Sequence, residues 1–298
     1  MTFSPADLPD LTGRTVVVTG ANAGIGEITA RELAAHGADV VLACRNVDAG
    51  KAAAASMTGS TRVEQLDLAS QASVHEFAER WNGPLDILIN NAGVMNPPRY
   101  RETVDGHELM FGTNHLGHFA LTGLLLPALL SATKPRVVTV SSIAHHGGDQ
   151  RVLAANPAEG YKPEPYYGNT KLANLLFARE LHRRATASGS PLVSTAAHPG
   201  VSATSLVASP DGMGANPLVR AVAPFFLPII FQSAAKGANP TLYAATLAEP
   251  GSYTGPQRVR ESRGPIGPAK LSTYAQDEQL GKDLWALSEE KTGVRFGL

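Results

Sequence analysis

The stretch "TVVVTGANAGIG", residues 15 to 26, joins a run of valines to a glycine-rich turn and then to a helical pattern. The valines predict a buried strand. Gly20, Gly24 and Gly26 would let the backbone approach a pyrophosphate at the positive end of the following helix. Because the spacing differs from G-x-G-x-x-G, the turn alone is also compatible with a packing role and no ligand. Its position directly after the first predicted strand favours the ligand site.

The rest of the chain repeats the same order of strand and helix. Short apolar runs that end in turn or polar residues alternate with longer helical patterns. This order predicts parallel strands joined by crossovers, with helices on both faces of one sheet. We therefore expect a doubly wound α/β fold in a single domain, residues 1–298. The expected strands are 15–20, 39–45, 63–68, 85–93, 136–142 and 192–200, and the expected helices are 24–36, 47–57, 70–81, 104–131 and 166–187.

Composition limits the function classes. The 298 residues are 43% hydrophobic and 17% charged, which is typical of a soluble globular protein, and the formal net charge of −1 gives no reason to expect a nucleic acid partner. Cys44 is the single cysteine, which excludes an internal disulfide and suits a reducing cytoplasm. The first residues lack a signal-peptide pattern, and the apolar run 217–230 is too short for a transmembrane segment.

The stretch "YYGNTK", residues 166 to 171, raises the possibility of acid/base chemistry. On a helix, Tyr167 lies four residues before Lys171 and shares its face, whereas Tyr166 is rotated away. A nearby ammonium group would lower the tyrosine pKa from its usual value of about 10. Tyr167 is therefore the candidate, although the same spacing is also typical of a surface aromatic on an ordinary helix.

Several motifs taken together resemble the short-chain dehydrogenase/reductase family, whose fingerprint is T-G-x-x-x-G-I-G. In the same order as in that family, the chain has "NNAG" at 90–93, "NHLGHF" from Asn114, "VSS" ending at Ser142, and "HPG" at 198–200. The resemblance implies a Rossmann fold and a catalytic tetrad of Asn114, Ser142, Tyr167 and Lys171. It also implies dinucleotide contacts at Gly20, Asn22, Ala23, Gly24, Ile25, Gly26, Asp67, Leu68, Asn91, Ala92, Gly93, Tyr167, Lys171, Pro199, Gly200, Val201 and Thr204.

Each tetrad residue has a physical role in carbonyl reduction, where the carbonyl carbon gains a hydride and its oxygen gains a proton. Tyr167 would supply the proton, and Ser142 would hold the same oxygen. Lys171 would lower the tyrosine pKa and bind the ribose hydroxyls. By resemblance, Asn114 would open a local irregularity in its helix where water joins Lys171 to solvent, and the alternative is a polar residue on a helix bend. Ser141 is not expected to be catalytic.

Finer matches resemble the retinol dehydrogenase and WW-domain oxidoreductase group. They include "SSIAHH", "NHLGHF", "GNTKLAN" and "LLLP". One departure is the separation of Ser142 and Tyr167 by 25 residues (167 − 142), longer than is usual, which predicts a loop beside the active site. His145 and His146 in that loop have no third ligand at metal spacing, so a loop structure is favoured and no metal site is predicted.

The residues at the end of the second strand bear on cofactor choice. Enzymes that prefer NAD carry an acidic residue there to hold the ribose 2′-hydroxyl, whereas a 2′-phosphate needs a cation. Here Cys44 occupies the usual acidic position and Arg45 follows it, so a guanidinium could bind the phosphate. Ala23 adds no second basic residue, and the prediction of NADP(H) depends mainly on Arg45.

The resulting hypothesis is an NADP(H)-dependent oxidoreductase acting on an apolar alcohol/carbonyl pair. The apolar segment at 205–232 follows "HPG", where the family carries its substrate flap, although packing against the body or another subunit is the alternative. Two other functions stay open: a dinucleotide-sensing regulator without catalysis, and an enzyme related to protochlorophyllide reductase. A homo-oligomer paired through the long predicted helices 104–131 and 166–187 is a further expectation.

Overall fold

The computed structural model describes residues 2–201 and 233–298. One sheet of eight strands organises these residues, in the order β3-β2-β1-β4-β5-β6-β7-β8. All neighbouring pairs are parallel except β7 and β8, which form an antiparallel pair at one edge. The strands are β1 (Thr15–Thr19), β2 (Asp39–Cys44), β3 (Thr61–Gln65), β4 (Ile87–Asn90), β5 (Arg136–Val140), β6 (Val193–Ala197), β7 (Tyr253–Arg258) and β8 (Arg263–Pro268).

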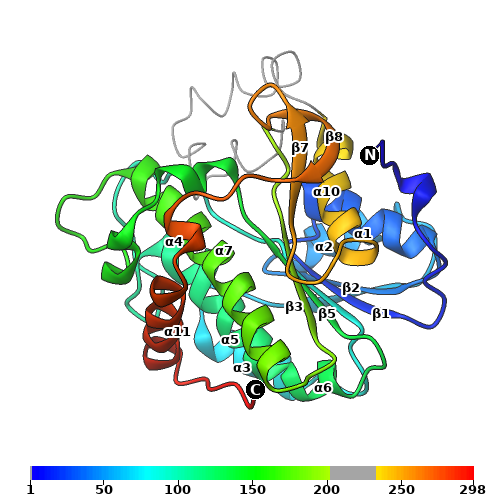
Figure 1. Ribbon diagram of the computed structural model, residues 1–298. Helices are drawn as coiled ribbons and strands as arrows, with labels where there is room; N and C mark the ends of the chain where they lie inside the picture. The colour runs from blue at the N-terminus through cyan, green and yellow to red at the C-terminus, as the bar shows by residue number, and fades with distance from the viewer. Residues whose placement is uncertain (1, 202–232) are drawn as a thin grey trace.

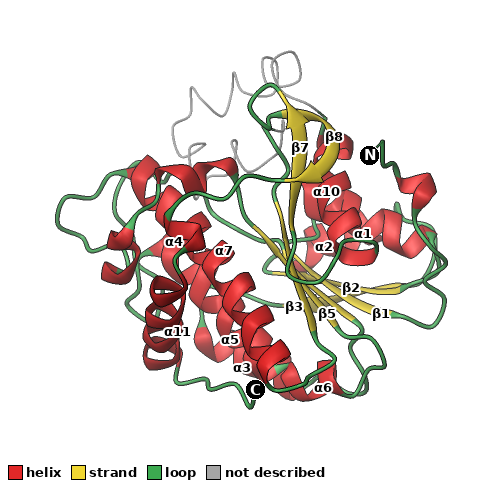
Figure 2. Ribbon diagram, viewed as in Figure 1, coloured by secondary structure: helices red, strands yellow, loops and turns green. Residues whose placement is uncertain are grey.

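Helices cover both faces of this sheet (Figures 1 and 2). On β1, Val16 and Val18 pack into the core beneath α1 (Gly24–Ala35) and α10 (Ala234–Thr246), whereas Val17 packs into the opposite core. This alternation follows from the strand period of two, with both faces buried. The opposite core is covered by α3 (Gln71–Glu79), α5 (Gly117–Leu124), α7 (Pro163–Ala187) and α11 (Glu278–Thr292). The predicted doubly wound α/β fold is confirmed.

The predicted helix 104–131 is interrupted. It consists of α4 (Leu109–Phe111), a π-helix η2 (Gly112–Leu116), α5 and α6 (Leu126–Leu130). The break between α5 and α6 falls at Leu125, and Pro127 stands in the first turn of α6, where a missing N–H costs little. The remaining predicted helices are present, with α2 at Val47–Ala54 and α7 beginning three residues early at Pro163.

The structure adds elements that the sequence patterns did not predict, namely β7, β8, α10 and α11. Helix α11 packs along α7 and α5, so it covers part of the surface that was expected to pair subunits (Figure 1). Within the described ranges, no helix is both long and apolar enough to cross a bilayer. The predicted flap at 205–232 lies outside the described residues.

The carboxyl ends of β1, β4, β5 and β6 lead into the predicted functional motifs. β1 and β4 are neighbours although two strands separate them in the sequence, so the crossovers leave in opposite directions from this point. In open α/β sheets, ligands bind outside the carboxyl ends of strands at such a switch point.

Candidate active site

The glycine-rich turn is packed against the "NNAG" segment. The Thr19 hydroxyl accepts hydrogen bonds from the backbone N–H groups of Asn91 and Ala92, each at 2.9 Å, and the Asn91 side chain donates to the Thr19 carbonyl at 2.8 Å. A Cβ on Gly26 would lie 2.6 Å from the Gly20 carbonyl oxygen and 2.4 Å from Asn91 Nδ2. Gly26 is therefore required for close backbone packing.

The start of α1 suits a dinucleotide phosphate. Gly20 and Gly24 have φ values of +65° and +63°, a left-handed conformation that favours glycine. The residue before the helix, Ala23, offers no side-chain hydrogen bond to the first turn, so the helix N–H groups there have no side-chain cap. Unsatisfied N–H groups at the positive end of a helix bind anions. These residues fit the pyrophosphate that was predicted to lie here.

The end of β2 carries the residues predicted to select the cofactor. Cys44 is buried at the last position of β2, and hydrogen bonds from the backbone of Ala21 and Asn22 reach its thiol. Burial raises the pKa of the Cys44 thiol to about 11, although these hydrogen bonds oppose the shift. Arg45 is exposed directly after it. After β3, the Asp67 side chain accepts from the Ala69 N–H at 2.9 Å, and Leu68 is buried beside it.

Asn114 lies in the π-helix η2, so the predicted irregularity is present. Its side chain is fully buried and makes three hydrogen bonds. Oδ1 accepts from Val94 N–H at 2.7 Å, and Nδ2 donates to the Val94 carbonyl at 2.9 Å and to Thr170 Oγ1 at 3.1 Å. Asn114 therefore connects the loop that follows β4 with helix α7. Single-turn π-helices are frequent at functional sites because they redirect a side chain or a backbone carbonyl.

Tyr167 and Lys171 lie one turn apart on α7 and are 8% and 4% exposed. The lysine Nζ lies 5.6 Å from the centre of the tyrosine ring and donates to the Val140 carbonyl at 3.2 Å. Burial lowers the pKa of Lys171 to about 8. The net downward shift of the Tyr167 pKa that was expected beside Lys171 is not found. Burial raises the pKa of Tyr167 to about 12, against the effect of a hydrogen bond with Ser142.

The two serines after β5 have separate roles. Ser142 precedes a short 3-10 helix, η3 (Ile143–Gly147), and its hydroxyl accepts from the Ala144 N–H at 3.1 Å while also interacting with Tyr167. Ser141 instead donates to the Lys171 carbonyl at 2.7 Å, which holds α7 against the sheet. The structure thus brings Asn114, Ser142, Tyr167 and Lys171 together at one corner of the sheet.

Tyr166 points away from this corner. Its hydroxyl donates to the carbonyl of Pro157 at 2.8 Å, within the loop that separates Ser142 from Tyr167. The two phenols of "YYGNTK" are therefore on different faces of α7, as the helical spacing predicted.

The rings of His145 and His146 contact each other at an interplanar angle of 37°, with ring centres 4.1 Å apart. His145 Nε2 accepts from the Ser272 N–H at 3.2 Å, and burial lowers the pKa of His145 to about 4, so this imidazole is neutral near pH 7. No group of three potential metal ligands occurs in the part of the chain that the structure describes.

The loop predicted to hold the nicotinamide contacts the turn between β7 and β8, two strands that the sequence patterns did not predict. Gly200 N–H donates to His198 Nδ1 at 3.2 Å, and Val201 N–H donates to the Ser262 carbonyl at 3.0 Å. Ser262 follows a turn between β7 and β8 in which Val259, Arg260 and Glu261 all have positive φ. Pro199 precedes Gly200 in this loop, and Thr204 lies outside the described residues.

Glu261 in that turn reaches the buried His198. Its Oε2 lies 3.3 Å from His198 Nε2, and its Oε1 accepts from the Lys270 N–H at 3.0 Å. Burial, with nearby His145 and His146, lowers the pKa of His198 to about 3, so His198 is neutral. No sequence motif indicated the partnership of Glu261 and His198, because the two residues come from separate, irregular segments.

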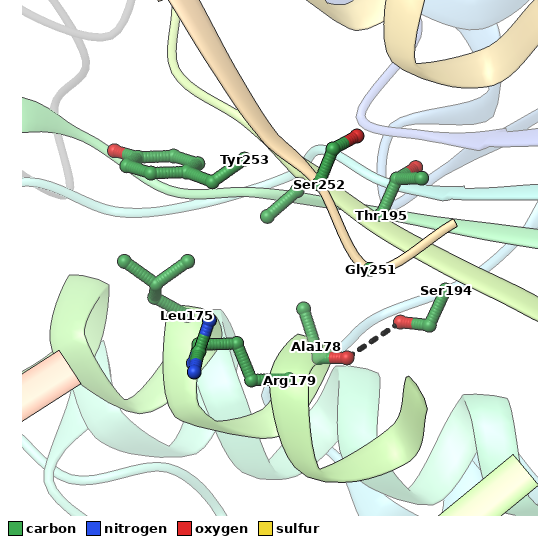
Figure 3. Close-up of a pocket in the computed structure, with 9 residues that line it drawn as sticks. Leu175, Ala178, Arg179, Ser194, Thr195, Gly251, Ser252 and Tyr253 are labelled. Carbon is green, nitrogen blue, oxygen red and sulfur yellow. Dashed lines mark hydrogen bonds between the residues drawn. The ribbon is translucent and has the colours of Figure 1, made fainter. Parts of the chain in front are cut away.

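A small crevice lies between α7, β6 and the start of β7 (Figure 3). Leu175 and Arg179 of α7 face Ser252 and Tyr253 across it, and Ser194 Oγ donates to the Ala178 carbonyl at 2.8 Å on its floor. None of its lining residues belongs to the predicted site. The crevice lies beside the part of α7 that follows Lys171, so it does not give access to Tyr167.

Comparison with known proteins identifies the family. Residues 14–211 match the family described as short chain dehydrogenase. The chain is 39% identical to retinol dehydrogenase 12 of Mus musculus, covering 95% of this chain and 88% of that protein. It is also 39% identical to polyprenol dehydrogenase of Mus musculus, covering 99% and 88%.

Solved structures agree with this assignment. The crystal structure of an uncharacterized protein from Mycobacterium Paratuberculosis is 44% identical over the whole of both chains, with a TM-score of 0.85. A short chain dehydrogenase from Escherichia coli CFT073, complexed with NADPH, shares the fold at 22% identity and a TM-score of 0.60, covering 80% of this chain and 92% of that one. The protein described here belongs to the short-chain dehydrogenase/reductase family of oxidoreductases, which bind a nicotinamide dinucleotide and act on alcohol/carbonyl pairs.

Proposed function

We propose that this protein is an NADP(H)-dependent oxidoreductase that interconverts an apolar alcohol and its carbonyl compound, with Tyr167 as the acid/base. The observation that carries the proposal is the convergence of Ser142, Tyr167, Lys171 and Asn114 at one buried corner. That corner lies beside the glycine-rich turn. The turn packs against the "NNAG" segment, and the next residue, Val94, is bonded to Asn114.

The proton chemistry follows from the pKa values of these groups. When bound, the dinucleotide supplies the hydride, and the chain must supply the proton. A phenol whose pKa burial raises to about 12 is protonated at pH 7, which suits a donor to a carbonyl oxygen. With its pKa near 8, Lys171 is largely charged at pH 7, and its positive charge stabilises the phenolate that forms as the proton leaves.

Ser142 and Asn114 hold this geometry. The Ser142 hydroxyl already interacts with the phenol, so a substrate oxygen bound between the two would meet both a proton donor and a second hydrogen-bonding group. Asn114 fixes the loop after β4 relative to Thr170 on α7, next to Lys171. A water connecting Lys171 to solvent near Asn114 is part of the proposal.

An apolar substrate is supported by the surroundings of Tyr167. The Tyr167 side chain packs in a cluster with Val94, Leu109 and Met110, so one side of its surroundings offers apolar contact. The relatives named retinol dehydrogenase and polyprenol dehydrogenase point in the same direction. NADP(H) is favoured because no carboxylate stands at the end of β2, where Cys44 is followed by the exposed Arg45.

The test is a panel of long and short apolar aldehydes and ketones, with NADPH oxidation followed by absorbance. With one substrate that turns over, Tyr167→Phe should lower kcat by roughly 100- to 10,000-fold, the usual contribution of a positioned general acid. Tyr166→Phe is the matched control and should lose far less activity than Tyr167→Phe, since its hydroxyl bonds outside the corner.

Equal losses in the two tyrosine variants, both folded, would remove Tyr167 as the acid/base. Tight NADPH binding without turnover of any compound in the panel would instead favour a dinucleotide-sensing protein.

A further inference from the structure

The loop of residues 143–162, between Ser142 and Tyr167, folds back onto the catalytic helices. It contains η3 and a second 3-10 helix, η4 (Gln150–Ala154), and it appears as the green segment before α7 in Figure 1. Directly after η4, Ala155 and Asn156 have φ values of +53° and +57°. This left-handed conformation costs a residue such as Ala155 roughly 1–2 kcal/mol and costs asparagine less, so the surrounding contacts must help to hold the segment there.

The Asn156 side chain supplies those contacts. It is 1% exposed, and both of its N–H donors and its oxygen are used. Nδ2 donates to Glu108 Oε2 at 3.0 Å and to the Tyr166 carbonyl at 3.1 Å, and Oδ1 accepts from Asn169 Nδ2 at 3.2 Å. One amide thus joins the loop to two positions on α7 and to the start of α4.

Glu108 extends this connection to the π-helix. It is 2% exposed, and it accepts from the N–H groups of Met110 at 3.0 Å and Phe111 at 2.8 Å, which are the first turn of the segment that carries Asn114. Burial raises the pKa of Glu108, whereas these donors and Asn156 favour the charged carboxylate. The orphan N–H groups before the π-helix are therefore satisfied by a carboxylate that Asn156 holds in place.

Two tyrosines attach the outer part of the loop. Tyr166 donates to the Pro157 carbonyl, and Tyr161 donates to the Pro97 carbonyl at 2.7 Å in the segment after β4. Their rings pack edge to face with centres 5.1 Å apart. The loop therefore contacts the segment after β4, the helix of Asn114 and the helix of Tyr167.

We propose that the loop 143–162 is a brace for the catalytic corner, in which Asn156 and Glu108 are positioning residues that set Asn114 relative to Tyr167. The inference rests on the proposed function, because it assigns these residues to the geometry of that reaction. A displacement of about 1 Å in a catalytic group can cost on the order of 100-fold in rate, so a brace without substrate contact has a measurable effect.

The test compares Asn156→Gly with Ala155→Gly. Glycine accepts the left-handed backbone at both positions, so neither variant strains the backbone and both add similar flexibility, but only the first removes the amide. Asn156→Gly should lower kcat by roughly 10- to 100-fold and leave the NADPH Kd within about 2-fold, because it disturbs the tetrad and not the glycine-rich turn. Ala155→Gly should match wild type in both quantities.

Hydrogen exchange gives a readout that does not depend on turnover. The amides of residues 108–118 should exchange faster in Asn156→Gly than in Ala155→Gly, with the sheet amides unchanged. Glu108→Gln should lower kcat as well, and in the Glu108→Gln/Asn156→Gly double variant the loss should be smaller than the product of the single losses, because both changes break one connection.

Equal effects of the two glycine substitutions on kcat and on exchange, or additive losses in the double variant, would overturn the brace. If wild type turned over no substrate, the proposed function would fail, while the exchange comparison would still decide whether Asn156 holds the π-helix.

Discussion

The glycine-rich turn and the corner that holds Tyr167 and Lys171 are neighbours at the carboxyl edge of the sheet, but they are held by different kinds of contact. Around Gly20 and Gly26, backbone packs on backbone and on small groups of "NNAG", with no room for one added carbon. Around Tyr167, buried polar side chains such as Asn114 and Lys171 hold the geometry through hydrogen bonds. The first region is therefore sensitive to volume, and the second to charge and protonation.

This difference predicts opposite relations between stability and activity. A buried cation is costly, since burial lowers the pKa of Lys171 from its ordinary value of 10.5 to about 8. The charge that Lys171 places beside Tyr167 therefore lowers the stability of the fold. In the glycine-rich turn, the conformation that fits a phosphate is also the one that packs well, so no such conflict exists.

The largest expected effect is that of Lys171→Met. Activity should fall by roughly 1,000-fold or more, because the variant loses both the charge beside the phenol and the predicted ribose contact. At pH 7 the same variant should be more stable than wild type, by about 1–3 kcal/mol, since a pKa lowered to about 8 corresponds to roughly 3 kcal/mol of unfavourable burial.

The stability difference between Lys171→Met and wild type should depend on pH. Between pH 8 and 10.5 the unfolded chain binds more protons at Lys171 than the folded protein, so wild-type stability rises with pH across this window. The advantage of Lys171→Met should therefore shrink as the pH rises from about 8 to about 10.5. Urea unfolding at pH 7 and pH 10 measures it, with Lys134→Met as the exposed control. If Lys171→Met were less stable than wild type at pH 7, the buried charge of Lys171 would not be destabilising.

A smaller effect is expected from Gly26→Ala, which tests the volume-sensitive region. The added methyl would meet the Gly20 carbonyl at 2.6 Å, and backbone cannot move aside as a flexible side chain can. Overpacking of this kind costs roughly 1–3 kcal/mol, and we expect the NADPH Kd to rise roughly tenfold or more. Unlike Lys171→Met, this variant should lose stability and binding together.

Gly297→Ala is the matched control, because nothing lies within 4 Å of the added carbon at that position. Calorimetry and NADPH fluorescence titration give the two quantities. Retained stability together with retained affinity in Gly26→Ala would mean that the turn does not pack as described.

Most of the strands that were predictable from sequence are buried on both faces. The strands β1, β2, β4 and β5 consist mainly of valine, isoleucine, leucine and alanine, because both faces of a parallel sheet are covered. By contrast, β7 ("YTGPQR") and β8 ("RGPIGP") are rich in glycine and proline. Proline is tolerated in β8 because β8 is the edge strand, and in β7 because Pro256 lies beyond the two residues, Tyr253 and Thr254, that pair with β6. Helix α10 contains Pro240 in its interior, and because proline usually ends a helix, the sequence pattern did not predict this helix.

Residues of the candidate site could be predicted where the chemistry requires a residue type at a fixed spacing in the sequence. They could not be predicted where a side chain is held by a residue from a distant segment. Tyr167 and Lys171 share a helix face at a spacing of four residues, so the pair was visible. Asn156 and Glu108 are separated by 48 residues, and neither has a local motif that indicates the other. The net downward pKa shift expected for Tyr167 was not found for a related reason, since spacing predicts the proximity of Lys171 but not the burial of the phenol, which raises its pKa.

The smallest expected effect concerns the end of β2, beside the glycine-rich turn. If Arg45 binds the 2′-phosphate, Arg45→Ala should lower kcat/KM for NADPH by roughly tenfold and leave NADH nearly unchanged, because an exposed charge-assisted contact is worth about 1.5 kcal/mol. This change removes charge without altering the packing of the turn, so the protein should keep its stability.

Cys44→Asp should go further and invert the preference. The backbone groups of Ala21 and Asn22 that hydrogen-bond to the thiol would then bond to a carboxylate, so the turn already offers donors for the new charge. That carboxylate would repel a 2′-phosphate and accept from the 2′-hydroxyl of NADH. The measurement is kcat/KM with both cofactors in wild type and both variants, using one carbonyl substrate. A wild-type protein that already favours NADH, or an Arg45→Ala variant with an unchanged NADPH to NADH ratio, would end the NADP(H) assignment, and it would leave the role of Tyr167 to be decided by its own variants.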